Sequence, residues 1–257
     1  MANVASVLAQ QGKEVLIVDE NTRNSVSSFF GLRAGNDLMR VLEGASPVDD
    51  ALIRLAPGLR VLQAATAVQR LAALSHSQRE MLLHTIGRLT PAPDIVLVDT
   101  SRAHPLGFSP FGLAAHDTVM VLSANGDAIT ETYALIKKVS LGYARKHFRL
   151  VVTQARSQDE AMAIFGNIAH VTKSRRIAHL EYAGFVPGEA SVLRQSMRLA
   201  QPAVSAFPDA KVSRAYKAIA SNLLTWPTPD DSDGGIEQFL QQLLHLSQHI
   251  DPVPIYA

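Results

Sequence analysis

The stretch ANVASVLAQQGKEVLIVDEN (residues 2–21) decides the fold. It predicts a short amphipathic helix, a turn at Gly12 and a buried strand at Glu14–Val18 that ends in Asp19. A helix that feeds a parallel strand normally follows another strand, because the crossover unit is strand–helix–strand. Only Met1 precedes this helix. We therefore expect that, if the preceding strand carries a phosphate loop, this loop lies upstream of Met1.

The rest of the chain alternates between strand-like and helix-like patterns. Six short runs are rich in β-branched and apolar residues, and several are apolar on both alternating faces, as strands between two helix layers must be. These runs are residues 14–18, 59–64, 94–99, 118–123, 148–153 and 180–186. Helical periodicity is found at residues 77–89, 128–144, 159–172, 189–199 and 209–224. The alternation predicts an α/β fold with a three-layer, doubly wound, mostly parallel sheet.

The composition is that of an ordinary globular protein: 47% of the 257 residues are hydrophobic and 18% are charged. The formal net charge of +1 gives no electrostatic argument for nucleic acid as a partner, and we expect no nucleic acid. Without cysteine the chain can form neither a disulfide nor a thiolate zinc site, which suits a cytoplasmic protein. The sequence also shows neither a spanning apolar run nor a signal-peptide pattern.

Two carboxylates end strands that are expected to be neighbours. Asp19 follows the first buried run and Asp99 ends the run DIVLVD. Ligands bind at the carboxyl ends of the strands in such sheets, and Mg²⁺ prefers hard oxygen ligands. The pair therefore predicts a site for Mg²⁺ and phosphate. The alternative is that each acid only caps the turn or helix that follows it. A dinucleotide site at Asp19 has less support, because its Gly-rich turn would lie off the chain.

The order and spacing of several longer runs resemble the MinD/ParA-type ATPases, and among them the flagellar number regulators of the FlhG (FleN) group. The resemblance covers about residues 2–224 and rests on KEVLIVDEN (13–21), FFGLRAGNDLMRVLEG (29–44), DIVLVDT (94–100), ETYALIKKVS (131–140) and EYAGFVPGEASVLRQSMRLAQPAVSAFPDAKVSRAYKAIA (181–220). It implies a P-loop NTPase fold, ATP and Mg²⁺ as cofactors, ATP-dependent homodimerisation and peripheral membrane contact. The family's phosphate loop, a Gly-rich turn ending in Lys-Thr, is absent from this chain, so we expect an N-terminally truncated version of that fold.

The resemblance also implies roles for residues on the phosphate side of the site. Asp19 and Asn21 occupy the family's catalytic Asp-x-Asp motif, with Asn21 where the second Asp positions the attacking water. An amide can orient water but cannot accept its proton. Asp99 and Thr100 match the end of the Walker B strand, so that Asp99 and Asp19 are the implied metal residues. The Ser101–Pro105 segment is bulkier than the small pair usual there, and we expect weak or absent ATP hydrolysis.

On the base side, the resemblance implies nucleotide binding by Gln154, Pro187 and Glu189. Gln154 stands where the family usually has an Asn that contacts adenine, and Pro187 and Glu189 match a Pro-x-acid loop beside the base.

The C-terminal end differs in composition from the rest of the chain. From Trp226 onward the chain has five acidic residues and no Lys or Arg. We predict an α/β domain at 1–225, an acidic linker at 226–235 and an amphipathic helix with a tail at 236–257. The apolar stripe of residues 236–250 either packs on its own domain or binds a partner. The resemblance instead implies a membrane anchor, although interfacial helices usually carry cations that this segment lacks.

Two functional hypotheses remain open. The first is an FlhG-like, MinD-like regulator of flagellar biosynthesis or placement. It would act through protein partners, such as flagellar assembly or transcription regulators, in the cytoplasm or peripherally at the inner membrane. The second is an active ATP-hydrolysing MinD/ParA-type ATPase with its phosphate loop upstream of Met1, with a role in cellulose-synthesis regulation or partitioning.

Overall fold

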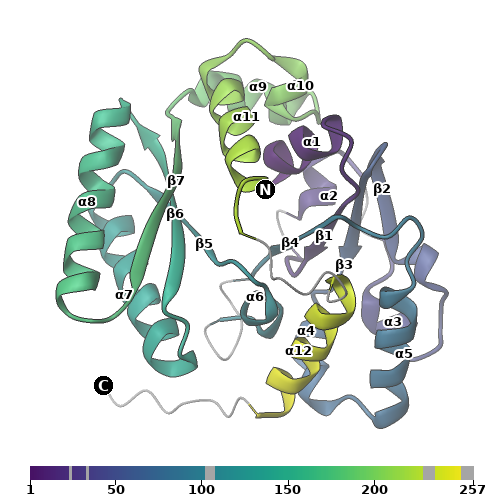
Figure 1. Cartoon of the computed structure of the whole chain (residues 1–257). Coiled ribbons are helices and arrows are strands. Elements are labelled where there is room, and N and C mark those ends of the chain that lie inside the picture. The colour runs from purple at the N-terminus through teal and green to yellow at the C-terminus, as the bar shows by residue number, and fades with distance from the viewer. Residues whose placement is uncertain (23–24, 33–34, 102–107, 228–234, 250–257) are drawn as a thin grey trace. The chain divides into compact units, whose positions relative to one another are not determined.

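The computed structural model describes residues 1–22, 25–32, 35–101, 108–227 and 235–249 (Figure 1). Residue contacts divide the chain into two compact units. Unit 1 consists of residues 1–116 together with 227–257, and unit 2 consists of residues 117–226. Each unit has its own sheet and is described by itself.

Unit 1 is built on a four-stranded sheet in the order β2-β3-β1-β4. Strand β1 (Val15–Asp19) pairs in parallel with β3 (Leu59–Gln63) on one edge and with β4 (Ile95–Asp99) on the other. Every residue of β1 is buried, as a strand with two paired edges and two covered faces requires. The helical elements of this unit are α1 (Ala2–Gln10), α2 (Val26–Phe29), α3 (Leu38–Leu42), η1 (Val48–Asp50), α4 (Ala67–Arg70), η2 (Leu71–Ala73), α5 (His76–Gly87), α6 (Pro110–Ala114) and α12 (Gly235–His249).

Strand β2 (Leu52–Ala56) is antiparallel to β3 and was not predicted. A tight turn at Pro57-Gly58 joins the two strands, and Gly58 has a φ of +69°. A side chain at this position would also lie 2.9 Å from the carbonyl oxygen of Lys13, so the turn requires glycine for two reasons. The Pro-Gly pair is a turn signal that could have indicated the hairpin.

The C-terminal helix α12 packs against α5 and α6 within unit 1. Leu240 and Leu243 are 1% and 0% exposed and belong to the same apolar core as Leu82 of α5. The ring of Phe239 lies 6.2 Å from the ring of Phe111, measured between centroids. The sequence left open whether the apolar face of this helix packs on its own domain or binds a partner. In the structure it packs on unit 1. Full burial of each leucine stabilises the docked helix by about 1.5–3 kcal/mol.

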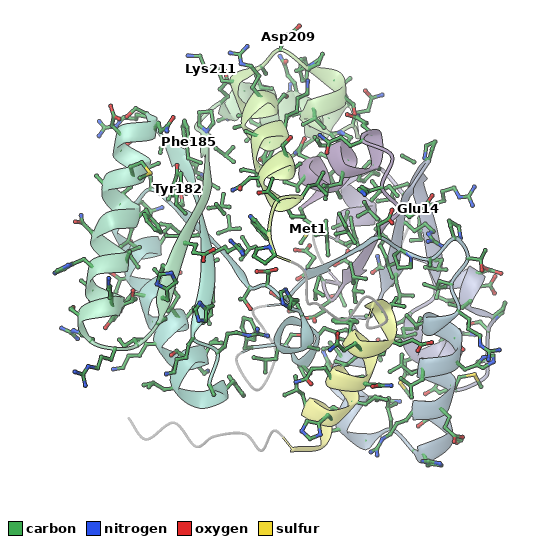
Figure 2. The ribbon with its side chains drawn as sticks, viewed as in Figure 1. Met1, Glu14, Tyr182, Phe185, Asp209 and Lys211 are labelled. Atoms are coloured by element: carbon green, nitrogen blue, oxygen red, sulfur yellow. The ribbon has the colours of Figure 1, made fainter. Side chains whose placement is uncertain are left out.

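Unit 2 has three parallel strands in the order β5-β6-β7, namely β5 (Val119–Ser123), β6 (His147–Ala155) and β7 (His179–Pro187). Helix α8 (Gln158–Ser174) packs on β6 and β7, and the ring of Phe165 lies 5.3 Å from that of Tyr182, which Figure 2 labels. Helix α11 (Lys211–Leu223) packs on β7, where Gly184 makes room for Ile219. The other helices are α7 (Gly126–Tyr143), α9 (Ala190–Arg198) and α10 (Ala203–Ala206).

The predicted α/β class with mostly parallel strands is therefore confirmed. All six predicted strands are present with small changes at their ends. In the described residues, however, the strands form two hydrogen-bonded sheets, one in each unit, and one pairing is antiparallel. The division into domain, linker and tail remains a prediction, and most of the linker lies outside the described residues.

Replacement of Leu243 by alanine tests the docking of α12. We expect Leu243→Ala to lower the free energy of unfolding by about 2–5 kcal/mol, because it leaves a cavity in the apolar core. Urea denaturation followed by circular dichroism measures this change. The exposed neighbour Gln242 provides the matched control, and Gln242→Ala should change stability by about 0.5 kcal/mol or less. Equal effects of the two substitutions would show that α12 is not docked in solution.

Candidate functional site at the carboxyl ends of the strands

Asp19 is the most constrained of the predicted site residues. Its side chain is fully buried, and one carboxylate oxygen, Oδ2, accepts a hydrogen bond of 2.7 Å from the amide of Val26 at the start of α2. The other oxygen, Oδ1, accepts hydrogen bonds from the amide nitrogen and the side-chain nitrogen of Asn21, at 2.9 and 3.3 Å. The capping role considered from the sequence is therefore present for Asp19. It orders the turn between β1 and α2.

Asn21 connects the ends of two neighbouring strands. Its Nδ2 donates to the carbonyl oxygen of Asp99 at 3.1 Å, in addition to its bond to Asp19. Asp19 and Asp99 are themselves paired in the register of β1 and β4. The structure thus brings together the carboxylates and the amide that the sequence predicted as a group, with the amide held between the two strand ends.

Asp99 is partly buried and lies near both a negative and a positive charge. Burial raises the pKa of its carboxyl group, and the nearby charge of Asp19 adds to this rise. The amino group of Met1, which is labelled in Figure 2, and the hydrogen bond from Asn21 act in the opposite direction. Since the charge of Met1 acts on Asp99, helix α1 begins near the carboxyl end of β4. Thr100 follows directly, and its methyl group would lie 2.8 Å from a side chain added at Gly112 of α6.

Glu20 belongs to this group as well, although its role was not predicted from the sequence. It is 3% exposed, and its Oε2 accepts a hydrogen bond of 2.9 Å from the amide of Ser101. The hydroxyl of Ser109 donates to the other oxygen and also accepts from the amides of Phe111 and Gly112, so that it caps α6. Burial raises the pKa of Glu20 to about 7. The only sequence signal was its place in an unbroken polar run, Asp19-Glu20-Asn21, directly after a buried strand.

The base-side residues gather at the strand ends of unit 2. Gln154 has a left-handed backbone with a φ of +61°, and its Oε1 accepts a hydrogen bond of 2.9 Å from the hydroxyl of Ser123. Pro187 ends β7 and is paired with Ala155. Glu189 accepts a hydrogen bond of 2.8 Å from the amide of Val212, which places its carboxylate in the first turn of α11. Gln154 and Glu189 therefore also stabilise the local fold of unit 2. Asp19, Asn21 and Asp99 lie in unit 1.

The residues present fit only part of a magnesium–ATP site. Within the described ranges, no group of three or more His, Cys, Asp or Glu side chains could hold a metal ion. Mg²⁺ in phosphate sites, however, needs only one or two carboxylates, since waters and phosphates complete its shell. Asp19 and Asp99 fit that side of the ion. The chain has no Gly-x-x-x-x-Gly-Lys-Ser/Thr run, so the phosphate side is not supplied by its sequence.

Comparisons with known proteins agree with this picture. No protein-family profile matches the chain. The antiactivator FleN of Pseudomonas aeruginosa is 29% identical over 243 residues, covering 94% of this chain and 86% of FleN. The flagellum site-determining protein YlxH of Helicobacter pylori is 23% identical over 228 residues, covering 87% and 76% of the two chains. Among solved structures, the MinD cell division protein of Aquifex aeolicus has a TM-score of 0.65 at 19% identity, covering 89% and 91%.

The chain therefore has the fold of the MinD/ParA-type ATPases. The two relatives in sequence, FleN and YlxH, are an antiactivator and a flagellum site-determining protein, and FleN is a name of the group that the sequence resembles. A further neighbour, the ParA family ATPase of Chlorobium tepidum, has a TM-score of 0.61 at 15% identity and covers 86% of this chain and 90% of its own. No helix in the described part of the chain is long and apolar enough to cross a membrane.

The raised pKa of Glu20 predicts a pH-dependent stability for this protein. The pKa of Glu20 in the folded state, about 7, lies above its ordinary value of 4.5. The folded state therefore holds a proton on Glu20 that the unfolded state has released, and the free energy of unfolding falls as the pH rises from 4.5 to 7. The shift corresponds to about 3 kcal/mol, and Glu20→Gln should remove most of it. We expect the variant to gain about 2–3 kcal/mol over wild type between pH 5 and pH 8, measured by urea denaturation. Glu80→Gln, at an exposed site, is the control. Parallel pH profiles of wild type and Glu20→Gln would contradict the assignment.

Proposed function

We propose that the chain is an FlhG-like regulator of flagellar biosynthesis or placement that acts through protein partners, with weak or absent ATP hydrolysis. The observation that carries the proposal is the position of Asn21. A side chain that cannot accept a proton stands between Asp19 and Asp99, tied to both strand ends. The curated relatives, an antiactivator and a flagellum site-determining protein, support the process.

Each residue of the site has a defined task in this proposal. Bound Mg²⁺ would neutralise phosphate charge, with Asp99 and Asp19 holding its water shell and Thr100 beside them. Asn21 would orient water without taking its proton, so that any bound nucleotide acts mainly as a conformational signal. Gln154, Pro187 and Glu189 would contact the base. Solved neighbours include a MinD described as complexed with Mg-ADP, from Pyrococcus horikoshii, with a TM-score of 0.55.

In this proposal the chain acts by binding other proteins, and its C-terminal helix does not insert into lipid. Helix α12 contains no Lys or Arg, and its leucines are buried in unit 1. Interfacial helices need an exposed apolar face and usually cations on the polar face. We propose a cytoplasmic location, with flagellar assembly or transcription regulators as partners and a homodimer as one assembly. Peripheral contact with the inner membrane through residues 236–250 would first require α12 to leave its site.

Removal of the gene from its host tests the proposed function directly. We expect the number or position of flagella per cell to change, as counted by electron microscopy. A gene copy with Asn21→Ala should restore the normal count, because the proposal does not need hydrolysis. A copy with Leu16→Asp, which disrupts the buried core strand, should not restore it. Unchanged flagella in the deletion strain would contradict the proposal.

A second candidate is an active MinD/ParA-type ATPase whose phosphate loop lies upstream of Met1, with a role in cellulose-synthesis regulation or partitioning. Two observations favour it. Among the described strands, β4 pairs only with β1, so its outer edge can accept another parallel strand. The amino group of Met1 lies close enough to Asp99 to affect its pKa, which would place a preceding turn beside the predicted metal residues.

Extension of the chain separates the two candidates. The 257-residue chain should bind ATP·Mg²⁺ only at millimolar affinity or weaker in calorimetric titration, because its sequence has no phosphate loop. If the in-frame upstream sequence supplies that loop, the longer chain should bind ATP. The FlhG-like proposal then predicts little turnover, with Asn21→Asp raising it at least about tenfold through general-base catalysis. Rapid turnover by the longer chain with Asn21 intact would favour the second candidate.

A further inference from the structure

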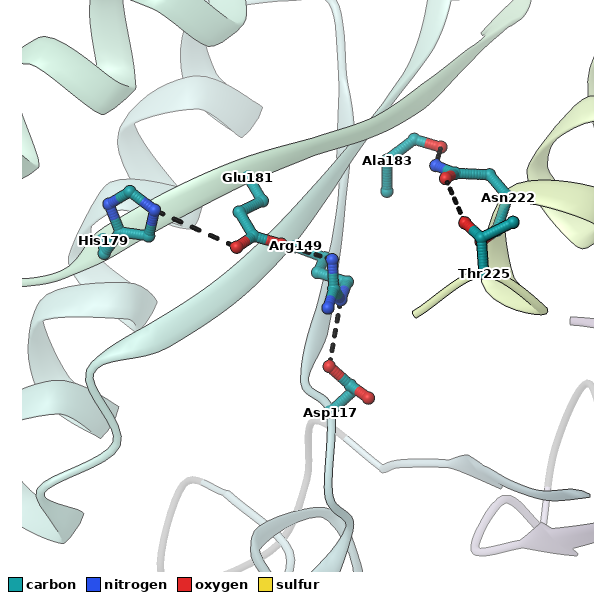
Figure 3. Close-up of polar contacts among 7 residues, drawn as sticks. All are labelled: Asp117, Arg149, His179, Glu181, Ala183, Asn222 and Thr225. Carbon is teal, nitrogen blue, oxygen red and sulfur yellow. Dashed lines mark hydrogen bonds and ion pairs between the residues drawn. The ribbon is translucent and has the colours of Figure 1, made fainter. Parts of the chain in front are cut away.

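The chain crosses between the two units twice, and both crossings meet the same side chain. The first crossing enters unit 2 at Asp117, and the second leaves it after Trp226. Arg149, on β6, donates a hydrogen bond of 2.9 Å from its Nε to Oδ1 of Asp117 (Figure 3). The guanidinium carbon of the same side chain lies 4.1 Å from the centroid of the Trp226 ring. Two segments that are far apart in the sequence are thus joined through one arginine.

Arg149 is itself held by the neighbouring strand. Its Nη1 donates to Glu181, which is its direct register partner on β7. His179 lies two residues away on the same strand, with its Nε2 4.0 Å from the Glu181 carboxylate (Figure 3). The main-chain amide of Arg149 also donates to the carbonyl oxygen of Thr118, at 2.9 Å. The Arg149 side chain is only 16% exposed, so its guanidinium has a fixed direction between two carboxylates.

The second crossing is shaped so that the indole reaches this guanidinium. The side-chain nitrogen of Asn222 donates to the carbonyl oxygen of Ala183 on β7, at 3.3 Å (Figure 3). The hydroxyl of Thr225 donates to the carbonyl oxygen of Asn222 at 2.7 Å, which closes the turn after α11. The amide of Trp226 continues this turn with a hydrogen bond of 3.2 Å to Leu223. The end of α11 is therefore anchored to the sheet just before the chain leaves the unit.

We propose that Arg149 is a clamp that fastens the first and last residues of unit 2, Asp117 and Trp226, to one point on β6, so that these two segments open together and not independently. A planar guanidinium suits this task, because its edge donates to carboxylates while its face stacks on the indole ring. A lysine ammonium keeps the charge but cannot make both contacts in one fixed orientation. The clamp couples Asp117 and Trp226, although the two residues are far apart in the sequence.

Hydrogen exchange and the single tryptophan of the chain test this coupling. In Arg149→Lys, peptides covering residues 113–118 and 222–227 should exchange at least about tenfold faster than in wild type. Acrylamide should also quench Trp226 fluorescence more strongly. Arg156→Lys, at an exposed ion pair with Glu160 just after β6, is the matched control and should change neither measurement.

Two further substitutions keep the test decisive even if Arg149→Lys fails to fold. Trp226→Leu retains an apolar side chain without the aromatic face, and it should speed exchange in residues 113–118. Asp117→Asn should in turn increase quenching of Trp226. If each substitution affects only its own crossing, the two connections are independent and the clamp is refuted.

Discussion

The buried carboxylate of Asp19 is the constraint on which the rest of unit 1 depends. Strand β1 is paired on both edges and buried along its whole length, and its last residue is a fully buried acid. A buried carboxylate without hydrogen-bond donors would cost several kcal/mol, so the chain that follows must supply them. It does so through the amides of Asn21 and Val26. This requirement fixes the course of the turn from β1 to α2.

The fixed turn has consequences well beyond β1. Because Asn21 faces Asp19, its amide group also reaches the end of β4. The neighbouring Glu20 accepts hydrogen bonds from Ser101 and from Ser109, the serine that caps α6. Helix α6 in turn presents Phe111 to α12. A continuous set of contacts within unit 1 therefore connects the strand-end carboxylates with the C-terminal helix.

The polar strand-end residues have roles in the fold that do not depend on any chemistry. The polar residues at the strand ends are structural as much as chemical: Asp19, Asn21 and Glu189 all bond main-chain groups. Selection for the fold alone would preserve them. The presence of these residues at the strand ends is thus weak support for hydrolysis by itself.

The sequence by itself determined six of the seven strands and the longer helices of the described residues, and which polar residues end the strands, but not the short helices such as α2, α3 and α6. Burial imposes a local periodicity on apolar residues, and that periodicity can be recognised without knowing the partner. This periodicity did not reveal β2, because the strand LIRLA is short, only half-buried and interrupted by the exposed Arg54. Only the tertiary structure decided three features: the burial of Glu20, the place where α12 docks and the contacts of Arg149. Each depends on residues distant in the sequence, such as Ser109, Phe111 or Trp226, and local patterns record that a side chain is buried but not what buries it.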